Sequence, residues 1–183
     1  MADLQGRMIG AMQADVKTFT EIEADTSAMG QAVTVIVIAG VAALIGNFFR
    51  YGVSAGIISL IGSLLGYALF SFLVFLIGTK LMPEPATKAD FNETFRVLGF
   101  AASPGVFNIL AIVPFLGPFI SFLVGIWSLV IAVIAVREVL DYSNTGRAII
   151  VCLIAVVIYL VVWGIILLPI LTAAFVARAA LGS

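Results

Sequence analysis

A short group of polar and helix-breaking residues sits inside an otherwise apolar stretch and is the best place in this sequence to look for chemistry. Its members are Ser103, Pro104, Asn108, Pro114 and Pro118. Proline has no backbone N–H, so Pro104 deprives the carbonyl of Phe100 of its usual helical donor, and another group must supply one. Two interpretations follow: a hydrogen-bonded helix kink, or a small polar cavity at a broken helix that would take a lipid headgroup or a solute.

Catalytic and metal chemistry has little support in the residue inventory. The 183 residues include no histidine and one cysteine, which excludes histidine-based acid–base catalysis, histidine or multi-cysteine metal sites and a disulfide framework. Ser103 has no neighbouring histidine or lysine to act as a base. We therefore expect a non-enzymatic protein with no cofactor and no metal. The formal net charge of −1 predicts no nucleic-acid partner.

The elements around this group must lie in a membrane. Hydrophobic residues make up 63% of the chain and charged residues only 10%, against about 25% charged in soluble domains. Charge-free runs cover 26–49, 51–79, 97–136 and 148–177. Because a helix needs about 20 residues to cross about 30 Å of hydrocarbon, the first, second and fourth runs each hold one span.

The run 97–136 is too long for one span and is interrupted in its middle by Pro114, Gly117 and Pro118. This pattern predicts a hairpin of two helices, either fully crossing or re-entrant. The predicted fold is an all-α integral membrane bundle of five helices, whose third and fourth form this Pro/Gly-broken hairpin. The expected spans are 31–49, 53–79, 95–113, 118–136 and 148–176, with a cytoplasmic lead-in at 1–30 and a short outside tail at 178–183.

Lysines and arginines divide unequally between the two ends of these spans. The side of the N-terminus holds Arg7, Lys17, Lys80, Lys88, Arg96, Arg137 and Arg147, whereas the other side holds only Arg50 and Arg178. Basic residues are enriched on the cytoplasmic side. We therefore expect a multi-pass protein of the cell (inner or plasma) membrane, with a cytoplasmic N-terminus and an outside C-terminus. No ionisable residue lies deep in a span, which argues against an ion-coupled pump.

Three segments on the cytoplasmic side are candidate contact surfaces. Apolar residues at steps of three or four over 4–22 predict one amphipathic helix, which is either an interfacial helix or a simple lead-in. In the loop 80–96, the spacing from Thr87 to Asp90 predicts a capping box, and Glu93 is placed to pair with Arg96. In the loop 137–147, Arg137 is placed to pair with Asp141. The candidate contact residues of the loops are Phe91, Phe95, Arg96, Arg137, Glu138 and Asp141.

Glycines and tryptophans within the spans indicate how the helices pack. Gly62 and Gly66 form a G-x-x-x-G motif, which lets helix backbones approach closely. Packing inside the bundle and formation of a homo-oligomer are the two uses of such a motif. Trp127 and Trp163 lie in the middle of their spans rather than at an interface, which predicts internal packing.

The order of several short motifs resembles that of a known family. An acidic segment, 18–25, precedes the first span, and Phe91-x3-Phe95-Arg96 leads into Val97-Leu98-Gly99-Phe100-Ala101-Ala102-Ser103-Pro104. The Pro/Gly hairpin follows, then Gly125-Ile126-Trp127 and Gly146-Arg147-Ala148. This order, over about residues 12–175, resembles the prokaryotic members of the Yip (Ypt-interacting protein) family.

The resemblance implies a five-helix bundle with a cytoplasmic N-terminus. Eukaryotic members are associated with Rab-type GTPases and vesicle traffic, but their Asp-Leu-Tyr-Gly-Pro type motif is absent from this sequence. We expect a non-enzymatic membrane protein that organises protein partners or lipids, through its N-terminal segment and loops. The alternative is a transporter or channel for a small solute or lipid, without ion coupling through an intramembrane acid.

Overall fold

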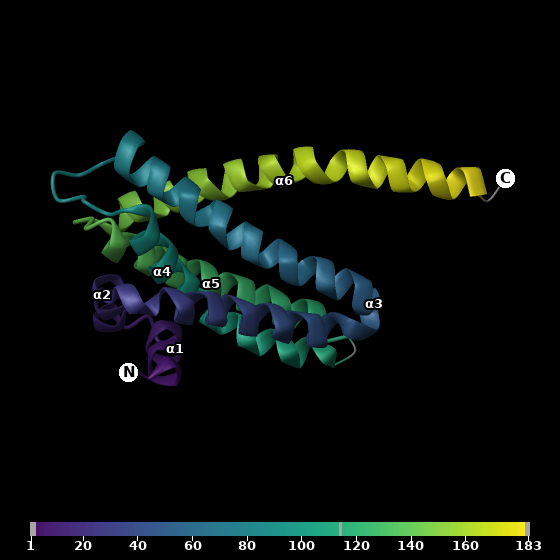
Figure 1. Ribbon diagram of the computed structural model, residues 1–183, viewed down its shortest axis with the longest axis horizontal. Coiled ribbons are helices and arrows are strands. Elements are labelled where there is room, and N and C mark those ends of the chain that lie inside the picture. The colour runs from purple at the N-terminus through teal and green to yellow at the C-terminus, as the bar shows by residue number, and fades with distance from the viewer. Residues whose placement is uncertain (1–2, 114, 182–183) are drawn as a thin grey trace.

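The computed structural model describes residues 3–113 and 115–181, and within these residues it is helical with no strand. Figure 1 shows helices that run side by side over most of the molecule, with the far part of the last helix extending beyond the others. The elements in chain order are α1 (Leu4–Met12), α2 (Val16–Ala24), η1 (Thr26–Ala28), α3 (Met29–Leu76), η2 (Ile77–Leu81), α4 (Phe91–Ala101), η3 (Ser103–Ile112), α5 (Gly117–Val139) and α6 (Thr145–Leu181).

The N-terminal segment forms two short helices rather than the single helix expected over 4–22. Ala14 adopts a left-handed backbone conformation with φ 57°, which a helix cannot continue through. Asp15 then caps α2, accepting hydrogen bonds from the backbone N–H of Lys17 and from the hydroxyl of Thr18. The prediction of one helix was wrong because Asp15 is a good N-cap residue, so it starts a helix instead of continuing one.

Helix α3 supplies the first two spans because the chain reverses direction inside it. Gly52 has φ 74° and ψ 175°, a conformation that costs glycine little and other residues much. Figure 1 shows the two arms of α3 running in opposite directions from this point. The membrane-length segments of the two arms are Thr26–Phe48 and Leu60–Leu81.

Asp90 caps the helix that starts the third span at Phe91, so the N-cap lies three residues later than the predicted one at Thr87. The Asp90 side chain accepts from the backbone N–H of Glu93, and the Glu93 side chain accepts from the backbone N–H of Asp90. Thr87 instead accepts from the backbone N–H of Glu84 and donates to the carbonyl of Leu140. The predicted box at Thr87 was therefore wrong, since the hydroxyl of Thr87 links two loops.

Five described segments are long and apolar enough to cross a membrane. Besides the two arms of α3, they are Phe91–Ile112, Gly117–Val139 and Thr145–Ile166. The predicted fold class, an all-α integral membrane protein with five spans, is confirmed. Helix α5 follows η3 after the short connection 113–116 and packs against it.

Small residues line the contact between the first arm of α3 and the third span, and we call this contact the small-residue seam. It pairs Ala32 with Gly99, Ala39 with Gly105, and Gly46 with the carbonyl of Asn108. A Cβ added to Gly105 would lie 2.7 Å from the Cβ of Ala39, closer than two carbon atoms pack. The backbones of the two spans therefore approach as closely as they do because these positions carry almost no side chain.

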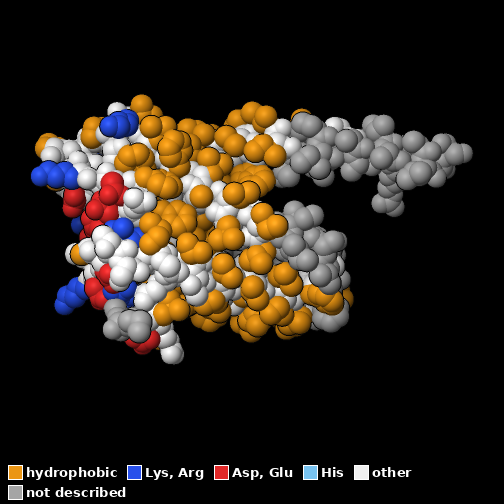
Figure 2. All heavy atoms as spheres, viewed as in Figure 1, with side chains coloured by type: hydrophobic (Ala, Val, Ile, Leu, Met, Phe, Trp, Pro, Cys, Tyr) orange, Lys and Arg blue, Asp and Glu red, His pale blue; other side chains and the backbone are white. Residues whose placement is uncertain are grey.

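Charged side chains gather at one end of the molecule, and apolar side chains are spread over the rest of the described surface in Figure 2. This charged end consists of α1, α2 and the two loops 82–90 and 140–146. The charges separate from the apolar surface because a charged group in hydrocarbon costs several kcal/mol.

Candidate functional site

The predicted polar group in the third span is locally hydrogen-bonded. The Ser103 hydroxyl donates to the carbonyl of Phe100 at 2.6 Å, which is the carbonyl left without a donor by Pro104. Ser103 and Pro104 are both buried, and the α-helix changes here to the tighter η3. The side chain of Asn108 donates to the carbonyl of Gly105 at 3.2 Å. Both polar side chains thus bond to the backbone of their own span.

The two prolines of the predicted hairpin, Pro114 and Pro118, do not belong to the hydrogen-bonded group formed by Ser103 and Asn108. Pro118 is exposed in the first turn of α5, where proline fits because the N–H there has no helical partner. Pro114 lies outside the described residues.

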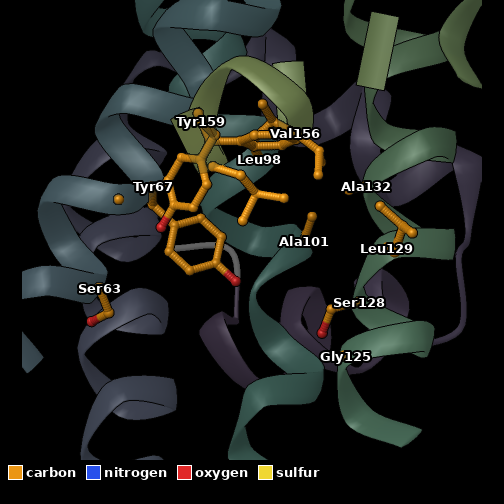
Figure 3. Close-up of a pocket in the computed structure, with 13 residues that line it drawn as sticks. Ser63, Tyr67, Leu98, Ala101, Gly125, Ser128, Leu129, Ala132, Val156 and Tyr159 are labelled. Carbon is orange, nitrogen blue, oxygen red and sulfur yellow. The ribbon is translucent and has the colours of Figure 1, made fainter. Parts of the chain in front are cut away.

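A pocket of about 460 Å³ opens elsewhere in the bundle, between the second arm of α3, α4, α5 and α6. Tyr67 and Tyr159 form one side and Ser128 lies opposite them, as Figure 3 shows. Neither Ser103 nor Asn108 lines the pocket, and none of the lining residues that the structure describes is charged. The four spans therefore enclose a predominantly apolar site rather than the polar cavity that the third-span residues suggested.

The G-x-x-x-G motif faces the same side of the bundle. A Cβ added to Gly66 would lie 2.7 Å from the hydroxyl of Tyr159, and one added to Gly62 would lie 3.9 Å from the ring of Trp163. The structure thus places the motif against α6 of the same chain.

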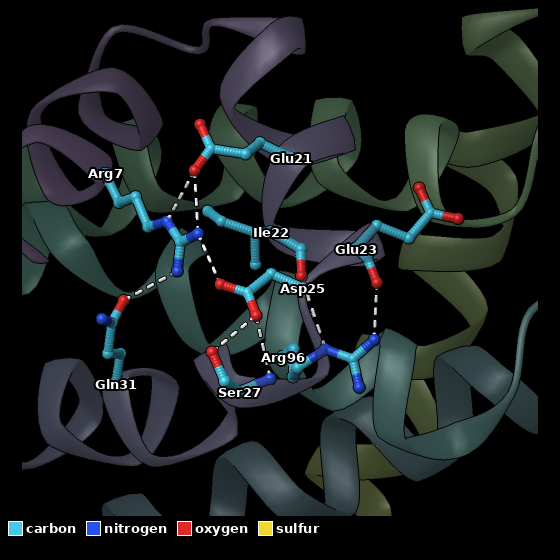
Figure 4. A network of polar contacts seen from close by, with 8 residues as sticks. All are labelled: Arg7, Glu21, Ile22, Glu23, Asp25, Ser27, Gln31 and Arg96. Atoms are coloured by element: carbon cyan, nitrogen blue, oxygen red, sulfur yellow. Dashed lines mark hydrogen bonds and ion pairs between the residues drawn. The ribbon is translucent and has the colours of Figure 1, made fainter. Parts of the chain in front are cut away.

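At the charged end, Arg7 ties the N-terminal helices to the first span. Its guanidinium donates to Glu21 at 2.8 Å, to Asp25 at 2.7 Å and to the side chain of Gln31 at 2.9 Å. Arg7 is only 5% exposed, and Figure 4 shows it enclosed by these partners. Such charge-assisted bonds are the strong ones, so they fix α1 and α2, the N-terminal cap, onto the bundle.

Arg96 joins the cap to the third span and is not the surface residue that its position suggested. Its side chain is 4% exposed and donates to the backbone carbonyls of Ile22 and Glu23, the latter at 2.5 Å. The last carbonyls of a helix lack internal donors and carry partial negative charge. Arg96 supplies the donors for α2, so the expected pair with Glu93 does not form.

The carboxylate of Glu23 lies near three other acids. Partial burial is the largest of the effects that together raise the pKa of Glu23 to about 7. The charges of Asp141, Glu93 and Glu138 add to it, and the charge of Arg96 opposes it. Figure 4 shows this carboxylate pointing away from the guanidinium of Arg96. By contrast, hydrogen bonds from Ser27 and Arg7 lower the pKa of Asp25 to about 2.

The loops of the charged end are bonded to each other. The Tyr142 hydroxyl donates to the carbonyl of Met82 at 2.8 Å and lies 3.2 Å from the carbonyl of Gly78, and Arg147 donates to the carbonyl of Pro83. Arg137 donates to the carbonyl of Tyr142 at 3.4 Å and lies 3.9 Å from Glu138. The predicted pair of Arg137 with Asp141 was wrong, because the chain turns at Asp141 with φ 52°.

The remaining candidate contact residues differ in exposure. Asp141 is exposed, whereas Glu138 has a side chain that is 20% exposed. Phe91 packs edge-on against Phe72 and Phe75 of the second span and lies beside Phe95. The two phenylalanines therefore hold the start of the third span against the second.

Trp127 joins the N-terminal cap to the fourth span. Its indole N–H donates to the carbonyl of Met12 at 3.0 Å, and the residue is 45% exposed. The expectation of internal packing was wrong for Trp127. Residue spacing could not predict this hydrogen bond, because the acceptor is the backbone carbonyl of a residue far away in the sequence.

These features together define a polytopic α-helical membrane protein with five spans and one charged end. The family model named Yip1 domain matches residues 9–166, so the chain belongs to the Yip family, as its motifs suggested. No curated protein and no solved structure matches the chain.

Proposed function

We propose that this protein organises protein partners or lipids in the membrane and does so without catalysing a reaction. The observation that carries the proposal is the separation of charge within the described residues. Charged side chains form a bonded surface at one end of the bundle, and the pocket between the spans carries none. The Yip family is not known for enzymatic activity, which supports the non-enzymatic role.

The charged end is the surface proposed to meet protein partners. Its cap is held by Arg7 and Arg96, and its loops are held to each other by Tyr142 and Arg147. A surface with a fixed shape loses less conformational entropy on binding than a flexible one. The exposed acids and bases around it would select partners by charge.

The protein is proposed to lie in the inner or plasma membrane of the cell, with its charged end in the cytoplasm. Seven of the nine lysines and arginines belong to the N-terminal segment and to the two loops on the same side of the spans. This excess supports a cytoplasmic N-terminus and an outside C-terminus. A C-terminal reporter that is active only outside the cytoplasm tests the orientation. Activity is expected, and a reporter that works only in the cytoplasm would refute the five-span topology.

Cross-linking in cells tests the partner role. A photoreactive amino acid is introduced at Lys88 or Asn144, which are exposed at the charged end, and at Leu160, which is 62% exposed on the apolar surface. Discrete protein adducts are expected from the first two positions and lipid adducts from Leu160. Absence of protein adducts from both charged-end positions would overturn the partner role.

The local hydrogen bonds of Ser103 and Asn108 favour this role over solute transport. Each polar side chain bonds to a carbonyl of its own span, so neither is presented to a solute path. The Ser103–Pro104 step therefore acts as a satisfied kink in the proposed account.

A further inference from the structure

The pocket between the second, third, fourth and fifth spans has the size of a ligand site. Its volume of about 460 Å³ lies in the range of about 300–1,000 Å³ typical of small-molecule pockets. It exists because small residues occupy wall positions: Ala101, Gly125 and Ala132. An additional Cβ at Gly125 would meet no atom within 4 Å, so this wall is open.

The position of the pocket determines which phase can reach it. Gly125 and Ala132 belong to the middle of the fourth span, Gly117–Val139, far from both of its ends. Leu129 of α5 and Leu160 of α6 also line the pocket, and they are 44% and 62% exposed. The pocket therefore opens sideways from the bundle between the exposed apolar side chains of α5 and α6, a surface that suits contact with lipid chains.

The lining favours an uncharged chain over a polar or ionised ligand. Among the described residues, the lining carries no charge, and an ion in an apolar site without a partner is strongly disfavoured. The hydroxyl of Ser63 already donates to the carbonyl of Leu60 at 2.7 Å. Leu98, Phe70 and the ring of Tyr67 supply apolar contact surface.

We propose that this pocket holds one acyl chain of a membrane phospholipid, entering between α5 and α6 at Leu129 and Leu160. A volume of about 460 Å³ is in the range of small-molecule pockets and offers room for part of one chain. The headgroup stays at the membrane surface, because the pocket has no charged group to receive it. A free fatty acid is a poorer fit, since its carboxylate would enter without a counter-charge.

Photolabelling of the purified full chain in mild detergent tests the proposal. The probe is phosphatidylcholine with a diazirine in one acyl chain, and labelled peptides are identified by mass spectrometry. Labels are expected on peptides containing Tyr67, Leu98 and Val156, which come from three different walls. Unlabelled phosphatidylcholine is expected to compete, and palmitate is not.

Matched variants separate the pocket from general lipid contact. Gly125→Leu fills the pocket, whereas Gly164→Leu adds the same side chain at another exposed glycine in open space, outside the pocket. A several-fold loss of labelling is expected only in Gly125→Leu, and Ser128→Leu provides a second filling variant if the first fails to fold. Equal labelling in folded filling variants and the control would overturn the proposal, as would displacement by palmitate or a cross-link to a second copy at the pocket.

The acyl-chain site specifies how the protein would bind lipids, and it rests on the proposed function of organising lipids in the membrane. The two can fail separately, since pocket labelling uses purified protein and the partner cross-links arise at the charged end. Labelling without partner adducts would remove the partner role alone, and partner adducts without pocket labelling would remove the acyl-chain site alone.

Discussion

The third and fifth spans of this bundle differ in how much of their surface other helices cover. In the most apolar stretch of Phe91–Ile112, 56% of the residues are buried, against 17% in that of Thr145–Ile166. The third span contacts the first through the small-residue seam, where glycine and alanine let the backbones meet. The fifth span buries small side chains such as Ala148 and Ala155 in its first half. Beyond them, the larger Tyr159 and Trp163 lie against the glycines of the second span, beside the pocket.

This difference shows that side-chain size determines how closely two helices pack in a membrane bundle. Lipid tails are as apolar as the helices, so close packing rather than hydrophobic burial brings spans together. Small residues at Gly46, Gly99 and Gly105 permit that close packing on one side. On the other side, Tyr159 contacts Gly66 while small residues such as Ala101 and Ala132 leave space unfilled.

The largest expected effect comes from blocking the seam. In Gly46→Leu the new side chain would collide with the backbone carbonyl of Asn108, which cannot move aside as a side chain can. We expect a loss of about 3 kcal/mol or more in the free energy of unfolding, measured by tryptophan fluorescence in detergent. Gly30→Leu, where an added Cβ meets nothing within 4 Å, is the control. Equal stability of the two variants would contradict the claim that close packing at the small-residue seam stabilises the bundle.

The next effect tests whether the cap is fixed to the third span. Arg96→Met keeps the length of the side chain but removes the donors for the carbonyls of Ile22 and Glu23. Cap docking should weaken by about 1.5–3 kcal/mol, measured as faster amide hydrogen exchange over 16–24. Arg137→Met, at a side chain 42% exposed, should change little. Unchanged exchange in Arg96→Met would mean that the cap is held by other contacts.

A smaller effect is expected at the kink of the third span. Ser103→Ala leaves the carbonyl of Phe100 without the donor that replaces the missing N–H of Pro104, at a cost of about 1 kcal/mol. Thr34→Ala is a matched control, because the hydroxyl of Thr34 donates to the carbonyl of Gly30 within a regular helix. Thermal unfolding should separate the variants. A control as destabilised as Ser103→Ala would contradict a specific role at the kink.

The smallest effect is a pH dependence of the cap. Burial and the neighbouring acids raise the pKa of Glu23 from 4.5 to about 7, so the folded state holds this proton more tightly than the unfolded chain. The resulting stabilisation is complete below about pH 4.5 and is lost as the pH rises through about 7. Hydrogen exchange over 16–24, corrected for its intrinsic pH dependence, should therefore speed up between about pH 5 and pH 7 and level off above that.

Glu23→Gln is the matched variant for this titration, since it cannot ionise. Its exchange should be independent of pH over that interval. The ion pair of Asp25 with Arg7 should stay constant there, because the pKa of Asp25 is lowered to about 2. A slope that persists in Glu23→Gln would assign the dependence to another group.

Composition and spacing were sufficient to predict five spans and the family, because a membrane places a strict length and polarity requirement on each helix. The role of Pro104 also followed from the sequence, since a missing N–H leaves one identifiable carbonyl. The contacts of Arg96 and Trp127 did not follow, because both donate to backbone carbonyls, which every residue possesses. The pocket arises from the relative placement of four spans, which no local pattern records.

Cysteine cross-linking in native membranes tests the contrast between the two sides most directly. Cys152 is first replaced by alanine, and two pairs are compared: Ala32→Cys with Gly99→Cys across the seam, and Ser63→Cys with Ser128→Cys across the pocket. A Cβ added to Gly99 would lie 2.9 Å from that of Ala32, so the spans need to part by only about 1 Å to reach the roughly 4 Å of a disulfide. Mild oxidation should therefore rapidly link the seam pair and leave unlinked Ser63→Cys and Ser128→Cys, which lie on opposite sides of the pocket (Figure 3). Rapid linkage of the pocket pair, or none at the seam, would contradict the account.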